Sequence, residues 1–403
     1  MKGVRAILAD PVLRLAVLAL FLYGAGIASV APYQSLVALG RLGLSEQAYS
    51  VVLIAGSLSA VAGALGVGLI GDRLNRRRSV AMMSAAVWAA GAAAIWLSAT
   101  PAAFVFGHVL LLPLGGTLFG QIFVLARLAA ADHPLRDDIM AAVRAIFALP
   151  FILILPLWSI AVAGGVSLLA VYAFCAVTGL GALAAIALGW PRDDSLPPVT
   201  VRTDFGSAFR ALVQGSVLAR LVALSFAKCS VLLYMVLLGP LLTGEGRPEA
   251  QVALFAGLVA GFEIPVMLGV GPALRRLGRS RLILAGTLLH GGFLLGLPLL
   301  AAHPALWALT LPAALGAGVT LSLPISYVQE MMADRPGAGG ALIAVNQFLA
   351  GVVMSGVFAL GTALGGFGLT AVLGAAAVVA GGIAIMILDR PAPAPAPVTP
   401  PGG

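Results

Sequence analysis

The stretch GLIGDRLNRRRSV, residues 68–80, has a counterpart in GPALRRLGRSRLI, residues 271–283, and this repetition decides the fold. The two stretches lie 203 residues apart, half the length of the 403-residue chain. Their glycine and arginine positions coincide, in the pairs Gly68 and Gly271, Arg73 and Arg276, and Arg78 and Arg281. Asn75 stands where the second stretch has Gly278, and these two residue types most readily turn the chain through positive φ. The chain therefore consists of two similar halves.

The composition places both halves in a membrane. Sixty-one percent of the residues are hydrophobic, nine percent are charged, and the mean hydropathy is +1.08, which excludes an ordinary soluble domain. Stretches long enough to cross a bilayer, about 20 apolar residues each, recur along the whole chain. The expected spans are 12–31, 48–70, 79–99, 102–126, 140–162, 166–189, 217–239, 251–271, 282–300, 304–328, 339–364 and 367–388. A cleavable signal peptide is the alternative for residues 1–31, but the apolar run exceeds a usual signal core.

The positive charges predict the orientation of these spans. If both termini lie on one side, that side receives 19 of the 23 Lys and Arg residues. The loops on the other side carry only Arg41 and Arg247. This asymmetry predicts cytoplasmic termini in a multi-pass protein of a bacterial inner membrane. The net charge of +8 then reflects topology, and we expect no nucleic-acid partner.

Six spans followed by six spans predict an all-α membrane protein, with twelve transmembrane helices in two pseudo-symmetric six-helix bundles. We expect the first bundle at residues 1–189 and the second at 216–388. The polar, proline-bearing stretch 190–215 is expected to be a cytoplasmic linker. Alternating prolines predict a disordered, extended tail at 389–403.

The loop GLIGDRLNRRR resembles the signature G-x-x-x-D-R-x-G-R-R between the second and third spans of the major facilitator superfamily, with Asn75 in place of the internal glycine. The resemblance implies the major facilitator fold and a secondary active transporter that works by alternating access. It also implies a cytoplasmic latch that favours one of the two conformations, formed by Gly68, Asp72, Arg73, Arg76 and Arg77. The alternative is that these arginines only set the topology.

Three further stretches resemble bacterial sugar efflux transporters. They are GQIFVLAR from Gly120, VRAIFALPFILILPL from Val143 and GLVAGFEIPVMLGVGPALRRLGRSRLI from Gly257. The chain departs from that pattern at Leu128, where those transporters usually have an acid, and at Ile154 and Leu155, where they have a Gly-Pro pair. The resemblance implies export of sugars or sugar-like metabolites.

Glu263 and Lys228 are the charged residues expected deepest in the membrane. A carboxylate at the centre of a membrane helix costs about 2.5–3.5 kcal/mol. At 1.5 Å per residue, Lys228 lies about 16 Å and Glu263 about 10–13 Å from the cytoplasmic ends of two adjacent spans. We therefore expect the two side chains to form a pair, with burial also favouring the neutral carboxyl group. Such a pair is either a structural brace or a proton switch, in which Glu263 takes up a proton and releases Lys228.

Other polar residues in the spans are candidates for substrate binding or gating. Gln121 and Arg144 each lie about 7 Å inside the cytoplasmic ends of adjacent spans, although Arg144 could instead extend to the interface. Asn346 is the counterpart of Arg144 in the repeat. The further cavity candidates are Tyr23, Gln34, Tyr234, Tyr327 and Gln347. For each of these the alternative is a packing role.

The remaining chemistry-bearing residues predict no reaction. We expect His108, His290, Cys175 and Cys229 to be core residues, and no nucleotide loop, metal site or catalytic triad is recognisable. We therefore expect no enzyme, no cofactor and no metal, with the proton gradient as the energy source. The leading hypothesis is a monomeric, proton-coupled exporter of sugars, with a small-molecule substrate and the lipid bilayer as its partners. The alternatives are a drug or amphiphile exporter of the same fold and a non-transporting sensor or accessory protein.

Overall fold

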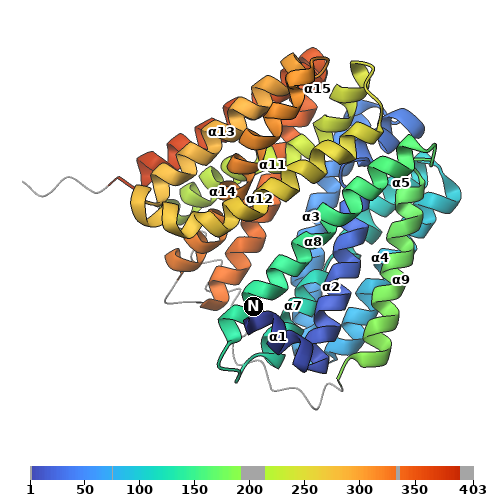
Figure 1. Cartoon of the computed structure of the whole chain (residues 1–403), viewed down its shortest axis with the longest axis vertical. Coiled ribbons are helices and arrows are strands. Elements are labelled where there is room, and N and C mark those ends of the chain that lie inside the picture. Colours follow the sequence, from blue (N-terminus) through green and yellow to red (C-terminus); the bar gives the residue numbers. More distant parts are fainter. Residues whose placement is uncertain (1, 75, 192–213, 333–335, 391–403) are drawn as a thin grey trace, which may run out of the picture.

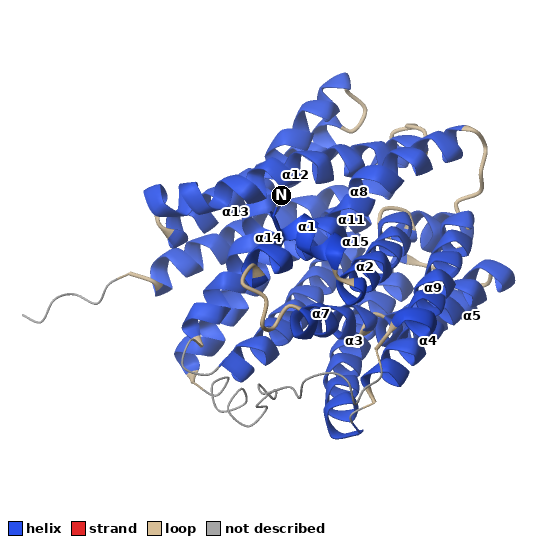
Figure 2. Cartoon of the chain, turned by 60° about the horizontal axis from the view of Figure 1, so that its bottom comes forward, coloured by secondary structure: helices blue, strands red, loops and turns tan. Residues whose placement is uncertain are grey.

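All regular secondary structure in the described part of the chain is helical, as the periodic apolar spans require (Figures 1 and 2). The computed structural model describes residues 2–74, 76–191, 214–332 and 336–390. Most of the predicted linker and tail therefore lie outside the described residues. Eleven described helices are long and apolar enough to cross a membrane, which agrees with the expected polytopic architecture.

The first half of the chain contains long helices and several short helical segments. A short helix α1, Lys2–Ala9, precedes the first span, α2, Pro11–Val30. The α2 helix begins where the sequence dictates, because the Asp10 carboxylate accepts hydrogen bonds from the backbone N–H of Val12 and Leu13, and Pro11 occupies the first helical position. The elements that follow are the π-helical turn η1, Leu36–Arg41, then α3, Glu46–Leu74, α4, Arg77–Ser98, α5, Pro101–Phe106, η2, Gly107–Leu111, α6, Leu112–Gly115, α7, Leu118–Ala129, α8, Arg136–Ala163, and α9, Ala170–Gly189.

The second half supplies the remaining spans. They are α11, Gly215–Gly244, α12, Ala250–Leu277, α13, Arg279–Leu300, the short turn η4, Pro304–Leu309, α14, Thr310–Met331, and α15, Pro336–Leu388. The α15 helix is too long for one crossing, and its backbone leaves the helical region at Gly365 and Gly366. Residues on either side of this kink correspond to the expected spans 339–364 and 367–388.

The helices pack mainly within their own half. In the first half α2 packs against α8 and α9, and α4 packs against α9. In the second half α11 and α13 pack against α15. Figure 1 shows the two groups next to each other, α1 to α9 in blue and green and α11 to α15 in yellow to red. The two halves meet where α3 contacts α15 and where α8 contacts α12.

Two faces of the helical assembly are distinguished by the chain direction. We call the face at which α3 ends and α4 begins, near Arg76, the terminal face, since α2 starts there. The face that carries η1 and the turn before α12 is the opposite face. Contacts between the halves include Tyr49 against Phe358, with ring centroids 5.7 Å apart, and Leu155 close to Gly257. These residues belong to the parts of their helices nearer the opposite face.

Candidate functional site

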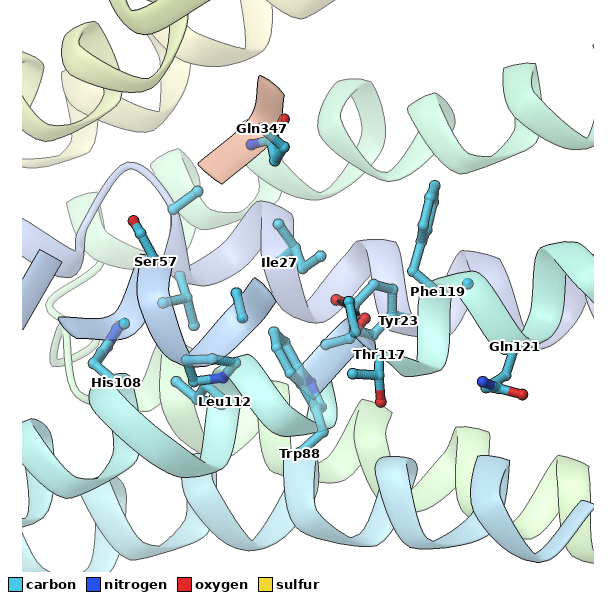
Figure 3. A pocket seen from close by; sticks show the side chains of 18 of the residues that line it. Tyr23, Ile27, Ser57, Trp88, His108, Leu112, Thr117, Phe119, Gln121 and Gln347 are labelled. Carbon is cyan, nitrogen blue, oxygen red and sulfur yellow. Dashed lines mark hydrogen bonds between the residues drawn. The ribbon is translucent and has the colours of Figure 1, made fainter. Parts of the chain in front are cut away.

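A cavity of about 940 Å³ lies among the helices of the first half, with one wall residue from the second (Figure 3). Its size falls within the range of small-molecule sites, about 300–1,000 Å³. The lining comes from α2 and the segment after it, α3, α4, the segment from η2 to α7, and α15. Gln347 is the α15 residue in that wall. The cavity therefore belongs to the first half, on the side that faces α15.

The polar side chains on the cavity wall are mainly neutral amides and hydroxyls. Amides come from Gln34, Gln121 and Gln347, and hydroxyls come from Tyr23, Ser57 and Thr117. Among the described residues that line the cavity there is no Asp, Glu, Lys or Arg. A side-chain amide both donates and accepts hydrogen bonds, as does a hydroxyl. The wall is thus able to bind hydroxyl groups of a neutral solute.

Aromatic rings form one side of the cavity. The ring of Tyr23 lies 4.8 Å from that of Trp88 and 6.4 Å from that of Phe119, measured between centroids. The Tyr23 hydroxyl donates a hydrogen bond of 3.3 Å to the Gly116 carbonyl oxygen. This bond and the neighbouring rings hold Tyr23 in the wall of the cavity, where its side chain is 5% exposed.

The fourth span is broken where it lines the cavity, although the sequence predicts one continuous helix at 102–126. The π-helical turn Gly107–Leu111 precedes α6, and the turn at Gly116 and Thr117 separates α6 from α7. Pro113 lacks a backbone N–H, which accounts for part of the irregularity. The Thr117 hydroxyl donates to the Leu114 carbonyl oxygen at 2.7 Å and lies 2.9 Å from the Ser84 hydroxyl. Breaks of this kind inside helices are frequent at functional sites.

Close packing holds the broken span against α4. A Cβ atom at Gly115 would lie 2.6 Å from the backbone N and Cα atoms of Trp88. Only glycine fits there, because distances below 3.0 Å to backbone atoms do not occur between real Cβ atoms and their neighbours. Gly115 therefore positions Trp88 and the turn that follows α6 next to the cavity.

His108 is both hydrogen-bonded and part of the cavity lining. Its Nε2 atom lies 2.7 Å from the Tyr172 hydroxyl, and its ring stacks on Phe104 at 4.2 Å. The sequence predicts a satisfied core residue, and Tyr172 provides the expected partner. The sequence gives no sign that the ring also lines the cavity. The π-helical turn places it there, and hydropathy does not reveal such a turn.

The structure divides the predicted binding residues into two groups. Tyr23, Gln34, Gln121 and Gln347 line the cavity. The residues Arg144, Asn346, Tyr234 and Tyr327 are outside its described lining.

Three of the residues outside the lining have other surroundings. Arg144 is exposed on α8 and makes no hydrogen bond to Gln121. The Tyr327 hydroxyl donates to Asp389 at 2.5 Å and accepts from Arg220 at 3.0 Å. Tyr234 is 2% exposed, and its ring lies edge-on to Phe293.

Asn346 connects two helices of the second half. Its side chain is 3% exposed, and its Nδ2 atom donates to the Leu221 carbonyl oxygen at 3.1 Å and to the Ser225 hydroxyl at 2.8 Å. All of this amide's described hydrogen bonds therefore go to α11. The neighbouring Gln347 is exposed and points to the cavity (Figure 3).

The expected ion pair between Lys228 and Glu263 is not formed in this structure. The described ion pairs within 4 Å are Arg41 with Glu249, Arg220 with Asp389, and Arg279 with Glu330. Lys228 follows Leu221 and Ser225 at helical spacing, so it lies on the stripe of α11 that Asn346 of α15 contacts.

Glu263 contacts α14 through its backbone and interacts electrostatically with Tyr234 of α11 through its carboxylate. It lies on α12, where its carbonyl oxygen is 3.6 Å from the position a Cβ atom would take at Gly318 of α14. The sequence gives the depth of each residue in the membrane, but it does not give the rotation of each helix, which decides whether two side chains at similar depth meet. Neither Lys228 nor Glu263 lines the described cavity.

Most side chains of the predicted latch lie outside the described part of the structure. Gly68, Asp72 and Arg73 are among residues whose side chains lie outside the described part of the structure. Arg76 directly precedes α4, and Arg77 is buried at the start of that helix. In the second half, the counterpart of Arg76 is Arg279, which pairs with Glu330 and lies over the Tyr327 ring at 5.3 Å.

Comparisons with known proteins agree with this architecture. The profile of the Major Facilitator Superfamily matches residues 16–355. A putative sugar efflux transporter of Deinococcus radiodurans is 29% identical over 365 residues, covering 85% of this chain and 88% of that protein. Sugar efflux transporter A of Escherichia coli is 26% identical over 258 residues, covering 62% of this chain and 63% of that protein.

Two solved structures share the fold at low sequence identity. The nucleoside transporter NupG superposes with a TM-score of 0.74 at 16% identity, covering 95% of this chain and 100% of NupG. An auto-inhibited peptide transporter of the POT family superposes with a TM-score of 0.73 at 12% identity, covering 94% of this chain and 97% of that structure. At these identities the likeness concerns the fold alone.

Proposed function

The chain belongs to the Major Facilitator Superfamily, a family of transporters and not of enzymes, and on that premise we propose that it exports sugars or sugar-like metabolites in exchange for protons. The observation that carries this proposal is the cavity of the first half that faces α15, which combines three amide side chains with aromatic rings and no formally charged lining residue in its described part. The names of the Deinococcus and Escherichia relatives add support.

The wall chemistry suits a neutral, hydroxylated solute. Gln34, Gln121 and Gln347 offer donors and acceptors to hydroxyl groups, and the partly exposed Phe119 ring offers an apolar surface to the C–H face of a sugar ring. A phosphate ester or an organic cation would enter this cavity without a charged partner, at a desolvation cost. Neutral sugars are therefore favoured over charged solutes.

A second candidate is supported by the apolar part of the same wall. Ile27, Val30, Leu65, Leu112 and Val124 also line the cavity. An exporter of amphiphiles or drugs would use such a surface, since apolar contact and shape provide most of the binding in sites of that kind. The two candidates differ in whether the amide groups are needed for transport.

Glu263 is proposed as the proton carrier. It lies in the middle of α12, and no described Lys or Arg forms an ion pair with it. An unpaired carboxylate in a membrane helix is costly, so its protonated form is favoured when it faces apolar surroundings, and a change of surroundings releases the proton. Ionisable residues inside membrane spans are typical of proton relays in transporters.

The positive charges orient the molecule in our proposal. The terminal face holds most of the arginines, so we assign it to the cytoplasm of a bacterium and place the protein in the inner membrane. The cavity would then load from the cytoplasm and empty outward.

Transport into inverted membrane vesicles tests the proposed function. Vesicles that contain the chain should accumulate labelled neutral sugars when their lumen is acidified, and a protonophore should abolish the accumulation. Vesicles that carry Glu263→Gln provide the matched control. Accumulation of cationic dyes without sugars would replace the proposal with amphiphile export. Transport of neither class across a broad panel would support an accessory role.

A further inference from the structure

A groove of about 430 Å³ lies between α12, α13 and α14 of the second half, and it shares no described lining residue with the larger cavity. All of its described lining residues are apolar or glycine. Along α12 the lining runs from Pro265 to Ala273, about 12 Å at 1.5 Å per residue. Along α13 it runs from Leu282 to Leu289. The groove is therefore long and apolar, and it suits a hydrocarbon chain better than a polar solute.

The α14 helix forms the floor of this groove, because glycines let it approach both neighbouring helices closely. A Cβ atom at Gly286 of α13 would lie 2.6 Å from the Val319 side chain of α14. A Cβ atom at Gly318 of α14 would lie 2.7 Å from the Val266 side chain of α12. At Gly269 of α12, by contrast, nothing described lies within 4 Å of the Cβ position. The α12 and α13 helices thus each pack on α14 and leave open space between them.

The open side of the groove faces the surroundings of the protein at membrane depth. Leu289 of α13 and Leu315 of α14 line the groove and are 39% and 41% exposed. Both residues lie within helices that are long and apolar enough to cross a membrane. Figures 1 and 2 show α13 and α14 on the side of the second half that is away from α4 and α9. Lipid tails are as apolar as leucine, so an acyl chain of the bilayer is the occupant that fits this position.

Three arginines stand where the groove reaches the terminal face. Arg275 and Arg276 lie in the last turn of α12, directly after the groove residue Ala273 and its neighbour. Arg281 directly precedes Leu282, the first groove residue of α13. All three arginines are exposed, and no described ion pair within 4 Å includes them. The apolar groove therefore ends at a cluster of positive charge.

The described carboxylates at this end of the groove are bound to other groups. Glu330 pairs with Arg279. Asp389 pairs with Arg220 and accepts a hydrogen bond from the Ser280 hydroxyl. The charge of the three exposed arginines is thus available to an anion from outside the protein. Guanidinium groups bind phosphate groups in a bidentate geometry, which an ammonium group does not offer.

We propose that this groove binds an anionic phospholipid of the bilayer. One acyl chain lies between α12 and α13, and the phosphate-bearing headgroup lies on Arg275, Arg276 and Arg281. Basic pockets between membrane helices bind anionic headgroups, and each arginine near the surface contributes about 1 kcal/mol to the attraction. A zwitterionic headgroup brings its own positive charge to the arginines and is therefore bound less tightly. The inference goes beyond the proposed function, because it concerns a lipid and not the transported solute.

Lipid titrations followed by native mass spectrometry test the headgroup site. The full chain in detergent is titrated with phosphatidylglycerol and with phosphatidylcholine that carry identical acyl chains. The first phosphatidylglycerol should bind about tenfold or more tightly than the first phosphatidylcholine. Arg275→Gln together with Arg281→Gln should remove this preference and leave phosphatidylcholine binding unchanged. Arg5→Gln together with Arg14→Gln is the matched control, since it removes two exposed charges from the terminal face of the first half.

A second pair of variants tests the groove itself. Gly269→Leu should lose the tightly bound phosphatidylglycerol, because the leucine occupies the open space between α12 and α13. Gly292→Leu is the matched control, since Gly292 is exposed on α13, has open space around it and is outside the groove lining. Leucine has a higher helix propensity than glycine, so both variants should keep the wild-type melting temperature in the absence of added lipid.

Three results would overturn the lipid site. The first is equal affinity of the wild-type chain for the two lipids. The second is an equal loss of phosphatidylglycerol in a test variant and its matched control. The third is a dimer in the mass spectrum that Gly269→Leu dissociates, which would assign the groove to a second copy of the chain. Failure of sugar transport in the vesicle assay would leave these affinities unaffected, so the lipid site and the proposed function fail separately.

Discussion

Replacing Asn346 with alanine should weaken the fold and leave substrate affinity unchanged, although the sequence ranks this residue as a binding candidate. The substitution removes hydrogen bonds to the Leu221 carbonyl oxygen and the Ser225 hydroxyl. Side-chain hydrogen bonds between membrane helices contribute about 0.6 kcal/mol each on average. Ser225 still donates to the Leu221 carbonyl oxygen at 2.7 Å, so neither group is left without a partner. The small cavity left by the amide adds about 1 kcal/mol, for a total of about 2 kcal/mol.

The neighbouring residue serves as the matched comparison. Gln347 is exposed in the cavity, so Gln347→Ala should change the free energy of unfolding by less than about 0.5 kcal/mol. Loss of one hydrogen bond to a neutral solute should raise KM by about two- to tenfold. The assay is unfolding of both purified variants in mixed micelles by SDS titration, with KM from vesicle uptake. A raised KM in Asn346→Ala at unchanged stability would refute the assignment of these two amides.

Three further predictions concern packing, coupling and the latch. Gly115→Ala should destabilise the protein by about 1–3 kcal/mol, because Gly115 lies close to Trp88. Gly120 has open space around it, so Gly120→Ala should not change the stability. Equal melting temperatures for the two variants would contradict this prediction. Glu263→Gln should abolish proton-driven accumulation while downhill exchange survives. Lys228→Met should keep accumulation, because no described ion pair joins the two residues. Loss of coupling in Lys228→Met alone would instead assign proton coupling to Lys228. Asp72→Asn should slow transport without loss of insertion, as measured by uptake kinetics at matched expression, and unchanged kinetics would leave the loop with a topological role only.

Much of the fold follows from the sequence because the membrane imposes length and apolarity on each span. The first expected span, 12–31, corresponds to Pro11–Val30, one residue earlier at each end. The break in the fourth span is different. It depends on π-helical geometry and on the packing of Gly115 against Trp88, and a hydropathy profile contains neither.

The candidate site is less predictable for a related reason. A helix that is apolar on all sides carries no amphipathic pattern, so the sequence does not indicate which side faces the cavity. Adjacent residues illustrate this, since Asn346 bonds to α11 while Gln347 lines the cavity. Depth along the membrane predicts a pair between Lys228 and Glu263, yet no described ion pair within 4 Å joins them. Rotation about the helix axis comes only from tertiary contacts.

Counterflow in proteoliposomes tests the central claim most directly. The purified chain, reconstituted without any other protein and loaded with an unlabelled neutral sugar, should take up the same sugar in labelled form faster than empty liposomes. Gln121→Ala together with Gln347→Ala should reduce this exchange, since both amides line the cavity. Exchange of a broad set of neutral sugars at the rate of empty liposomes, or exchange unaffected by loss of both amides, would contradict sugar transport through this cavity.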